Sequence, residues 1–333
     1  MKVKAIREYE MIDVARVLCA CMVVLIHMGF GNSIAIIPCV TRQAVPFFFL
    51  TSGFFLAKKL KGSGNALRTC WRYALSVLLV YAVWMIIWLP SIICDALAEH
   101  QNASLFYVVC IVLRRILTAG IAPYWYLLVL AEGAMVLALI INRKWLGWVF
   151  CVCGLILNTL YCMNLEDAVG SMIHRVFYTV FSWENNVIMS GFPMLFIGAL
   201  FSQNERTAGS LKLLAVALMY IGVIVAAFLL YPSDNALYGL PFGQTEAVLL
   251  FAFCIMLSRF STGLSRDMCV LFRNISSVIF LTHTVMLKII GECLHVWDPL
   301  IRFAAAIACG ILIMITVRTV KWKPLMKVFM VKN

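Results

Sequence analysis

Three residues near the start of the chain have the types and the spacing of a reaction centre. Asp13 and Arg16 lie three residues apart in an otherwise apolar stretch, so a helix places them as neighbours on one face. His27 follows Arg16 by eleven residues, about three turns, and returns to that face roughly 16 Å further along the axis. Imidazole is the side chain best suited to transfer a proton near neutral pH. The stripe therefore combines an acid, a permanent cation and a potential general base.

The same three residues also have a purely structural interpretation. Asp13 and Arg16 would pair with each other near the end of the helix, and His27 would donate a hydrogen bond to a neighbouring helix. Ionisable groups inside a membrane-spanning segment are costly, so they usually face a cavity or a partner. The spacing by itself leaves both interpretations open.

The helix that carries these residues belongs to a strongly apolar chain. Of 333 residues, 64% are hydrophobic and 13% are charged, with a mean hydropathy of +0.98. Soluble globular proteins are about half apolar and about a quarter charged. The apolar runs are long and unbroken, as at 74–94 and 211–230, unlike the short alternating strands of a membrane barrel. The sequence predicts an all-α, polytopic transmembrane helix bundle.

Ten segments approach the roughly 20 residues that cross about 30 Å of hydrocarbon. They are 12–30, 40–57, 71–94, 123–141, 145–163, 187–201, 211–231, 244–257, 275–291 and 299–317. Residues 104–117 are apolar but carry Arg114 and Arg115, which favours an interfacial or partly buried loop helix. We expect a single membrane domain over residues 1–333. The first run is long and holds charged residues, so we expect a permanent span and no cleavable signal peptide.

The basic residues predict the orientation in the membrane. With ten spans, one side receives Lys2, Lys4, Arg7, Lys58, Lys59, Lys61, Arg68, Arg72, Arg143, Lys144, Arg206, Lys212, Arg259, Arg266, Arg273, Arg318, Lys321, Lys323, Lys327 and Lys332. The other side keeps Arg42, Arg114, Arg115, Arg175 and Arg302. Both termini are therefore predicted to be cytoplasmic. This topology explains the net charge of +12, so we expect the lipid bilayer and no nucleic acid as a partner.

The thirteen cysteines do not indicate a metal centre. They are scattered, mostly within apolar runs, with no C-x-x-C pair and no histidine cluster at metal-binding spacing. We expect them to pack as small apolar side chains, and we expect no metal site.

Four motifs follow one another along the chain. The first span reads I-D-V-A-R-V-L-C-A-C-M-V-V-L-I-H, and the second reads V-P-F-F-F-L-T-S-G-F-F-L at 45–56. The fourth begins P-Y-W-Y-L at 123–127, and the ninth contains I-F-L-T-H-T-V at 279–285. In this order they resemble the acyltransferase 3 family of integral membrane proteins. The first two motifs are specific in combination, whereas the last two are weak alone.

The resemblance implies an acyltransferase in the cell membrane of a bacterium. Such an enzyme transfers an acyl group, usually acetyl, from cytoplasmic acyl-CoA to a hydroxyl of a cell-envelope carbohydrate or similar polar acceptor. The donor would be a substrate, and no cofactor would be bound permanently. His27 matches the family's catalytic histidine and would act as a general base or as an acyl relay. Arg16, with Asp13 beside it, matches the family arginine and would hold donor phosphate or the developing oxyanion.

The family also places paired arginines, commonly three residues apart, just before the third helix. Arg72 stands at that position, but Thr69 is three residues before it and the second arginine is Arg68, four before. Residues four apart still share a helix face, so the pair would clamp the phosphates of coenzyme A. A plain cluster of cytoplasmic basic residues is the alternative.

Three further polar residues inside predicted spans are candidates for the site. Glu132 and Glu246 each offer a carboxylate that would orient His27 or pair with Arg16. His283 lies between two threonines in the ninth span. A structural role, such as a hydrogen bond between helices, is the alternative for each.

A transporter or exporter of a small polar metabolite such as serine is the alternative function. The vancomycin-resistance serine racemases carry a similar ten-helix membrane domain, there fused to a soluble racemase and thought to supply serine. A third possibility is an inactive, structural member of the family. The sequence leaves open the acceptor, the acyl chain length and the oligomeric state.

Overall fold

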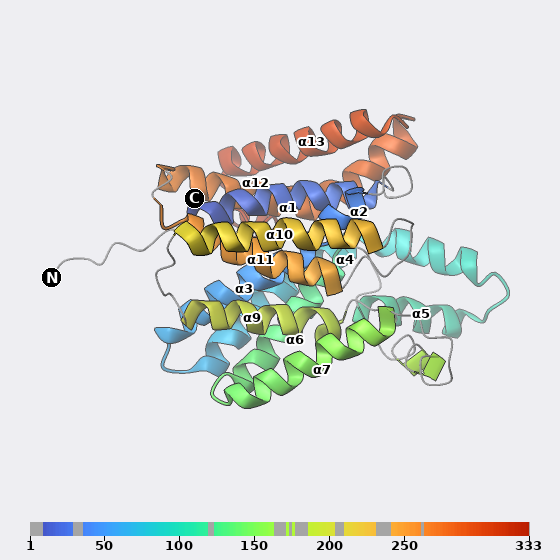
Figure 1. The fold of residues 1–333 in the computed structure, drawn as a ribbon. Helices are drawn as coiled ribbons and strands as arrows, with labels where there is room; N and C mark the ends of the chain where they lie inside the picture. The colour runs from blue at the N-terminus through green and yellow to red at the C-terminus, as the bar shows by residue number, and fades with distance from the viewer. Residues whose placement is uncertain are drawn as a thin grey trace. The chain divides into compact units, whose positions relative to one another are not determined.

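The computed structural model describes residues 9–28, 36–118, 123–162, 171–172, 175–176, 186–203, 210–230, 241–260 and 263–332. Throughout these residues the regular structure is helical (Figure 1). Four predicted cytoplasmic residues, Lys2, Lys4, Arg7 and Arg206, lie outside the described residues, as do the ends of predicted spans at 29–30, 163 and 231.

Two compact units divide the chain. The first unit comprises Met1–Ser52 and Leu200–Asn333, and the second comprises Gly53–Ala199. The boundaries fall inside α3 (Ala44–Lys61) and α9 (Phe192–Gln203).

The first unit contains the helix that carries the predicted reaction centre. That helix is α1 (Glu10–His27). The other elements of the unit are α2 (Ile36–Thr41), α10 (Ser210–Leu230), α11 (Pro241–Leu257), α12 (Arg266–Lys288), the π-helical turn η4 (Ile289–Cys293), α13 (Pro299–Val320) and α14 (Lys323–Val328). α1 packs along α12, which also packs on α13, and α10 packs along α11 (Figure 1). α12 thus lies between the first helix of the chain and one of the last.

The second unit is built around a long helix. Its elements are α4 (Ala66–Glu99), α5 (Leu105–Leu117), α6 (Trp125–Ile140), α7 (Lys144–Cys162) and the π-helical turn η2 (Val187–Gly191), which leads into α9. α4 packs against α6 and α5, and η2 packs against α6 and α7.

Several helices begin at a polar side chain that caps the first turn. Asn65 Oδ1 accepts from the Arg68 amide at 2.9 Å at the start of α4, and Asp298 Oδ1 accepts from the Ile301 amide at 2.9 Å before α13. Such caps satisfy amides that have no partner within the helix. The starts of these helices are therefore encoded locally.

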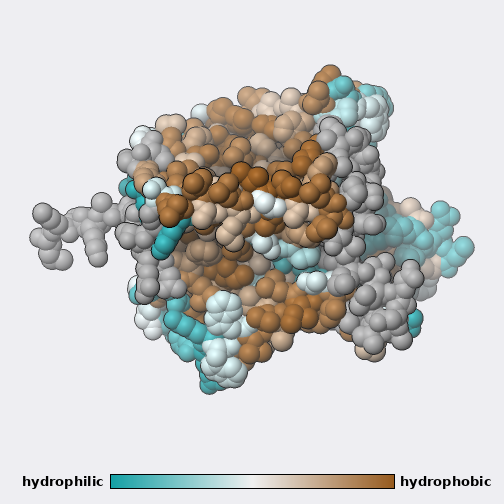
Figure 2. All heavy atoms as spheres, in the orientation of Figure 1, coloured by the Kyte–Doolittle hydropathy of each residue, from teal (hydrophilic) through white to brown (hydrophobic). Residues whose placement is uncertain are grey.

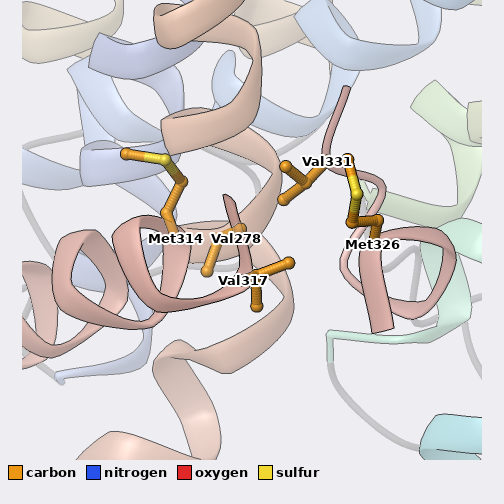
Figure 3. Packing of buried hydrophobic residues seen from close by; sticks show 5 residues of the cluster. All are labelled: Val278, Met314, Val317, Met326 and Val331. Atoms are coloured by element: carbon orange, nitrogen blue, oxygen red, sulfur yellow. The ribbon is translucent and has the colours of Figure 1, made fainter. Parts of the chain in front are cut away.

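The C-terminal segment closes one end of the first unit. Val278, Met314, Val317, Met326 and Val331 form a buried apolar cluster that joins α12, α13, α14 and the chain end (Figure 3). Asn274 fixes the segment at both of its amide atoms, donating to the Lys332 carbonyl at 2.7 Å and accepting from the Lys332 amide at 2.9 Å. The start of α12 is thereby held in place.

Glycines allow two pairs of helices to approach closely. In the second unit, a Cβ atom at Gly53 of α3 would lie 1.9 Å from the Leu195 carbonyl oxygen of α9. In the first unit, a Cβ at Gly310 of α13 would lie 2.9 Å from the side chain of Ile279. Small residues at such contacts are typical of membrane helix packing.

The structure corrects the length of the third predicted span, 71–94. α4 extends over 34 residues, about 51 Å at 1.5 Å per residue, which exceeds the hydrocarbon core by roughly 20 Å. The predicted helix at 104–117 is confirmed as α5, which packs Val108 and Val112 against Ile92 and Ala96 near the end of α4. An ion pair between Arg115 and Glu99 also joins the two helices.

Within the described residues each of the ten predicted spans overlaps a helix, although 40–57 contains the break between α2 and α3. Six described segments are long and apolar enough to cross a membrane, and α1 is not among them. They are Ile36–Lys61, Ala66–Glu99, Lys144–Tyr161, Ser210–Leu230, Arg266–Cys293 and Pro299–Val320. Three apolar helices, Trp125–Ile140, Val187–Gln203 and Pro241–Leu257, are shorter. α10 exposes leucines along its length, including Leu211, Leu218 and Leu229, and its visible surface is hydrophobic (Figure 2). These features indicate a membrane protein, while ten crossings and cytoplasmic termini stay predictions.

Candidate active site

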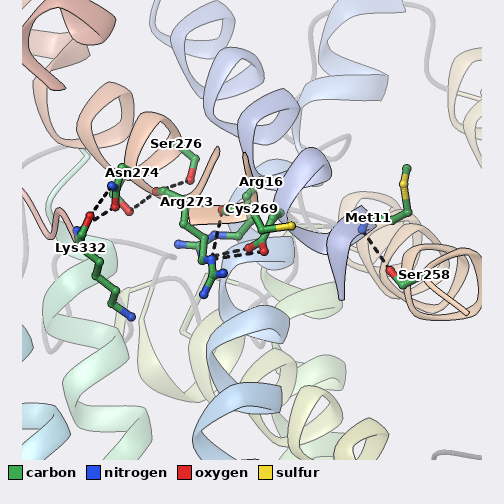
Figure 4. A network of polar contacts seen from close by, with 10 residues as sticks. Met11, Arg16, Ser258, Cys269, Arg273, Asn274, Ser276 and Lys332 are labelled. Atoms are coloured by element: carbon green, nitrogen blue, oxygen red, sulfur yellow. Dashed lines mark hydrogen bonds and ion pairs between the residues drawn. The ribbon is translucent and has the colours of Figure 1, made fainter. Parts of the chain in front are cut away.

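An ion-pair cluster joins α1 and α12 at one end of the helix pair (Figure 4). Asp13, which is 4% exposed, lies 3.9 Å from Arg16 Nη1 and 3.3 Å from Arg273 Nε. The predicted pairing of Asp13 with Arg16 is therefore present. Two guanidinium groups lie beside this carboxylate, and guanidinium groups are well suited to bind anions.

Neighbouring polar contacts hold this cluster in place. Arg273 Nε also donates to the Cys269 carbonyl at 3.2 Å, and the Met11 amide donates to Ser258 Oγ at 3.0 Å at the end of α11 (Figure 4). The first turn of α1 is thus joined to two other helices of the first unit. The Arg16 and Arg273 side chains keep 21% and 30% exposure, so both side chains are only partly buried.

Two histidines meet at the other end of the same helix pair. The rings of His27 and His283 are in contact, with centroids 5.0 Å apart and planes inclined by 41°. His283 is fully buried, and its Nδ1 atom lies 2.8 Å from the Phe280 carbonyl oxygen and 3.2 Å from that of Ile279. A carbonyl oxygen only accepts, so Nδ1 carries the proton and Nε2 keeps its lone pair.

The two helices present matching patterns because they run in the same direction. Arg16 precedes His27 by eleven residues on α1, and Arg273 precedes His283 by ten on α12, about 15–16 Å in each case. The structure therefore confirms that Asp13 and His27 share one face of α1, which is the face against α12. Sequence reasoning treated Arg273 only as a cytoplasmic basic residue. The repeated Arg-to-His spacing was the signal that could have identified it.

A second polar group lies where α2, α10 and α11 meet in the first unit. Gln43 is fully buried and shares a hydrogen bond with the Tyr220 hydroxyl, at 2.8 Å from Nε2. Arg42 directly follows α2, and its backbone would be 3.0 Å from a Cβ at Gly243 of α11. Sequence reasoning placed none of Arg42, Gln43 or Tyr220 at the site, because their grouping depends on helix packing.

Glu246 of α11 is fully buried. Among the described residues, neither of its carboxylate oxygens has a hydrogen-bond partner. The predicted partnership of Glu246 with His27 or Arg16 is therefore not formed as a hydrogen bond within the described part of the chain.

The remaining candidates belong to the second unit. Arg68 and Arg72 are both exposed in the first turns of α4, where four-residue spacing places them on one face. Glu132 is exposed on α6. The clamping of coenzyme A phosphates by Arg68 and Arg72 and the partnership of Glu132 with His27 or Arg16 stay predictions.

The aromatic residues of the motifs at 45–56 and 123–127 pack against other helices and do not join the polar clusters described above. In the first unit, Phe47 and Phe48 make edge contacts with Phe251 and Phe280 at 5.7 and 5.5 Å. In the second unit, Tyr124 stacks on Trp84 at 5.3 Å and accepts a hydrogen bond from Trp88 Nε1 at 3.1 Å. These motifs therefore encode the packing of the helices that carry the polar residues.

The chain matches the family model for the acyltransferase domain over residues 9–319, which includes both ion-pair and histidine clusters. No curated protein and no solved structure matches the chain significantly. Because the family model covers nearly the whole sequence, the chain belongs to the acyltransferase 3 family.

Proposed function

We propose that this acyltransferase moves an acyl group, in the simplest case acetyl, from cytoplasmic acyl-CoA to a hydroxyl of a cell-envelope carbohydrate or similar polar acceptor. One observation carries the proposal. The same pair of helices holds an imidazole pair at one end and a cationic cluster about 15 Å away at the other. Acyl transfer from acyl-CoA needs a proton acceptor for the attacking hydroxyl and an anion-binding group for the phosphates of the donor, and these helices offer both.

In the proposed reaction, His27 is the general base. It takes the proton of the acceptor hydroxyl as the oxygen attacks the thioester carbonyl carbon. A carbon–oxygen bond forms, the carbon–sulfur bond breaks, and the proton passes from His27 to the coenzyme A thiolate. The products are an ester and free coenzyme A.

The donor would be held by arginines. Arg16 and Arg273 form the cationic cluster of the first unit, and Arg68 and Arg72 form an exposed pair on α4. Guanidinium groups bind phosphate in a bidentate way, so both groups suit the phosphates of coenzyme A. Positive-inside topology would place both groups on the cytoplasmic side, where acyl-CoA is found.

The experiment is an acyl-transfer assay in washed membranes from expressing cells, which supply the acceptor, with radiolabelled acetyl-CoA as the donor. The wild type should transfer label to membrane material and release free thiol. His27→Ala should lower the rate at least about 100-fold, as expected for loss of a general base, with an unchanged amount of inserted protein. His295→Gln, at an exposed histidine, is the matched control and should keep full activity.

Two results would contradict the proposal. Absence of label transfer by the wild type, together with flux of labelled serine or another small solute, would favour a transporter. Full activity of His27→Ala would remove His27 from the mechanism.

A further inference from the structure

We propose that His283 is a positioning residue for His27, with its Nε2 atom as the hydrogen-bond acceptor that fixes the His27 imidazole. This inference rests on the proposed function, in which His27 is the base. His283 would have the place that a carboxylate has beside the histidine of a serine protease triad, but with a neutral ring.

The tautomer of His283 is set by its own helix. Nδ1 donates to the Phe280 carbonyl at 2.8 Å, which leaves the lone pair on Nε2. Nε2 is buried and has no hydrogen-bond partner among the described residues. A buried acceptor without a partner is costly, so this atom is available for a donor that arrives in the reactive state.

The ring in contact with His283 is the proposed base. An in-line bond between two imidazole nitrogens about 3 Å apart separates the ring centroids by roughly 5 Å. The observed centroid distance is 5.0 Å. The centroid distance therefore matches that of a hydrogen bond between the two rings, which would form when an N–H of His27 turns toward Nε2. Catalytic hydrogen bonds are often long or misaligned without substrate and tighten when it binds.

Among the described residues, His283 is the buried polar side chain that the structure records in ring contact with His27. The Thr282 hydroxyl donates to the Val278 carbonyl at 2.8 Å on its own helix, and no ring contact joins Thr282 or Thr284 to His27 as it joins His283 among the described residues. Glu246 makes no hydrogen bond to His27. An uncompensated carboxylate is also expensive to bury in an apolar bundle, whereas a neutral imidazole adds an acceptor without a charge.

The consequence for the reaction is direct. With one N–H of His27 donated to His283, the other nitrogen carries the lone pair and is directed to the acceptor hydroxyl. When His27 takes the proton, the bond to His283 stabilises the imidazolium. Loss of the hydrogen-bond partner that orients a metal-bound histidine typically costs about 10–100-fold, and we expect a loss of the same order for His27.

The experiment compares two amides and one apolar side chain at the same position. His283→Gln places an oxygen near the former Nε2, His283→Asn places its polar atoms near the former Nδ1, and His283→Met removes the acceptor. Thr282→Val, at the neighbouring buried residue, is the control for packing. The kcat, the KM for acetyl-CoA and the thermal unfolding midpoint in detergent are measured for each.

We expect kcat to fall about 10–100-fold in His283→Met and His283→Asn, with KM within about twofold and a smaller loss in His283→Gln. If His283→Met does not fold, the kcat of His283→Gln is compared with that of His283→Asn, and this comparison tests the inference. Equal kcat in these two variants at equal folded amounts would overturn the inference. Wild-type turnover that depends on His27 but is unchanged in His283→Met would also overturn it and leave the proposed function standing. Absence of turnover in the wild type would instead remove the proposed function.

Discussion

Arg273 Nε of α12 lies 3.3 Å from Asp13 Oδ2 of α1, so the first helix of the protein is tied to one of its last through a buried carboxylate. Asp13 also attracts Arg16, one turn along its own helix, at 3.9 Å. Since Asp13 is 4% exposed, these two cations stabilise its buried charge. The ion pair between Arg273 and Asp13 therefore holds α12 against α1 and also positions the cationic cluster.

The first prediction concerns this ion pair. Arg273→Met should destabilise the protein by about 1–3 kcal/mol, less than the 3–5 of a fully buried pair, because the Arg273 side chain is 30% exposed. Asp13→Asn should cost a similar amount. In a double-mutant cycle measured by SDS unfolding, the double variant should lose less than the sum of the two. Additive losses would show that the contact contributes no coupling.

The second prediction concerns the Ser-Gly pair of the motif at 45–56. Gly53→Ala should destabilise the protein by about 3 kcal/mol, at the upper end of overpacking effects, because its Cβ would meet the Leu195 carbonyl oxygen at 1.9 Å. The Cβ is fixed to the backbone of α3 and the carbonyl oxygen belongs to the backbone of α9, so the clash can be relieved only by moving one of the helices. The yield of folded protein in detergent and its thermal midpoint measure the effect.

Gly222→Ala is the matched control for this substitution. Gly222 lies in α10, and a Cβ there would have nothing within 4 Å. Alanine in a helix interior is favoured over glycine by roughly 0.5–1 kcal/mol, so the control should be neutral or stabilising. Equal effects of the two substitutions would contradict the close crossing of α3 and α9.

The sequence predicted the helices well because apolar length is a local property. Within the described residues each of the ten predicted segments overlaps a helix, and the stripe of Asp13, Arg16 and His27 was correct because helix periodicity determines it. The partners of that stripe were not predictable in the same way. The sequence offered His283 as a candidate, and the repeated Arg-to-His spacing could have pointed to Arg273, but the packing of α12 on α1 that brings both to the stripe is not visible in a single sequence. The role of Gly53 in packing was likewise hidden, because it depends on Leu195 far along the chain.

The third prediction concerns the buried hydrogen bond between Gln43 and Tyr220. Tyr220→Phe should cost about 1–3 kcal/mol, because the amide of the fully buried Gln43 loses its hydroxyl partner. Replacement of both partners by apolar groups of similar shape is often nearly neutral. The double variant Tyr220→Phe with Gln43→Met should therefore recover most of the loss in SDS unfolding. A double variant that is less stable than Tyr220→Phe would contradict this account.

The last prediction concerns donor binding by α4. If Arg68 and Arg72 hold phosphates of coenzyme A, each change to alanine should raise the KM for acetyl-CoA about tenfold, since a hydrogen bond to a charged group contributes about 1.5–3 kcal/mol, and should leave kcat nearly unchanged. The separation of KM from kcat follows because phosphates lie far from the reacting carbonyl, so these contacts are equal in the ground state and the transition state. Raised ionic strength should increase the KM of the wild type for the same reason. Arg143→Ala, an exposed arginine of the same unit, is the matched control and should change neither constant. A tenfold rise in KM with Arg143→Ala as well would indicate a general effect of surface charge rather than a phosphate clamp on α4.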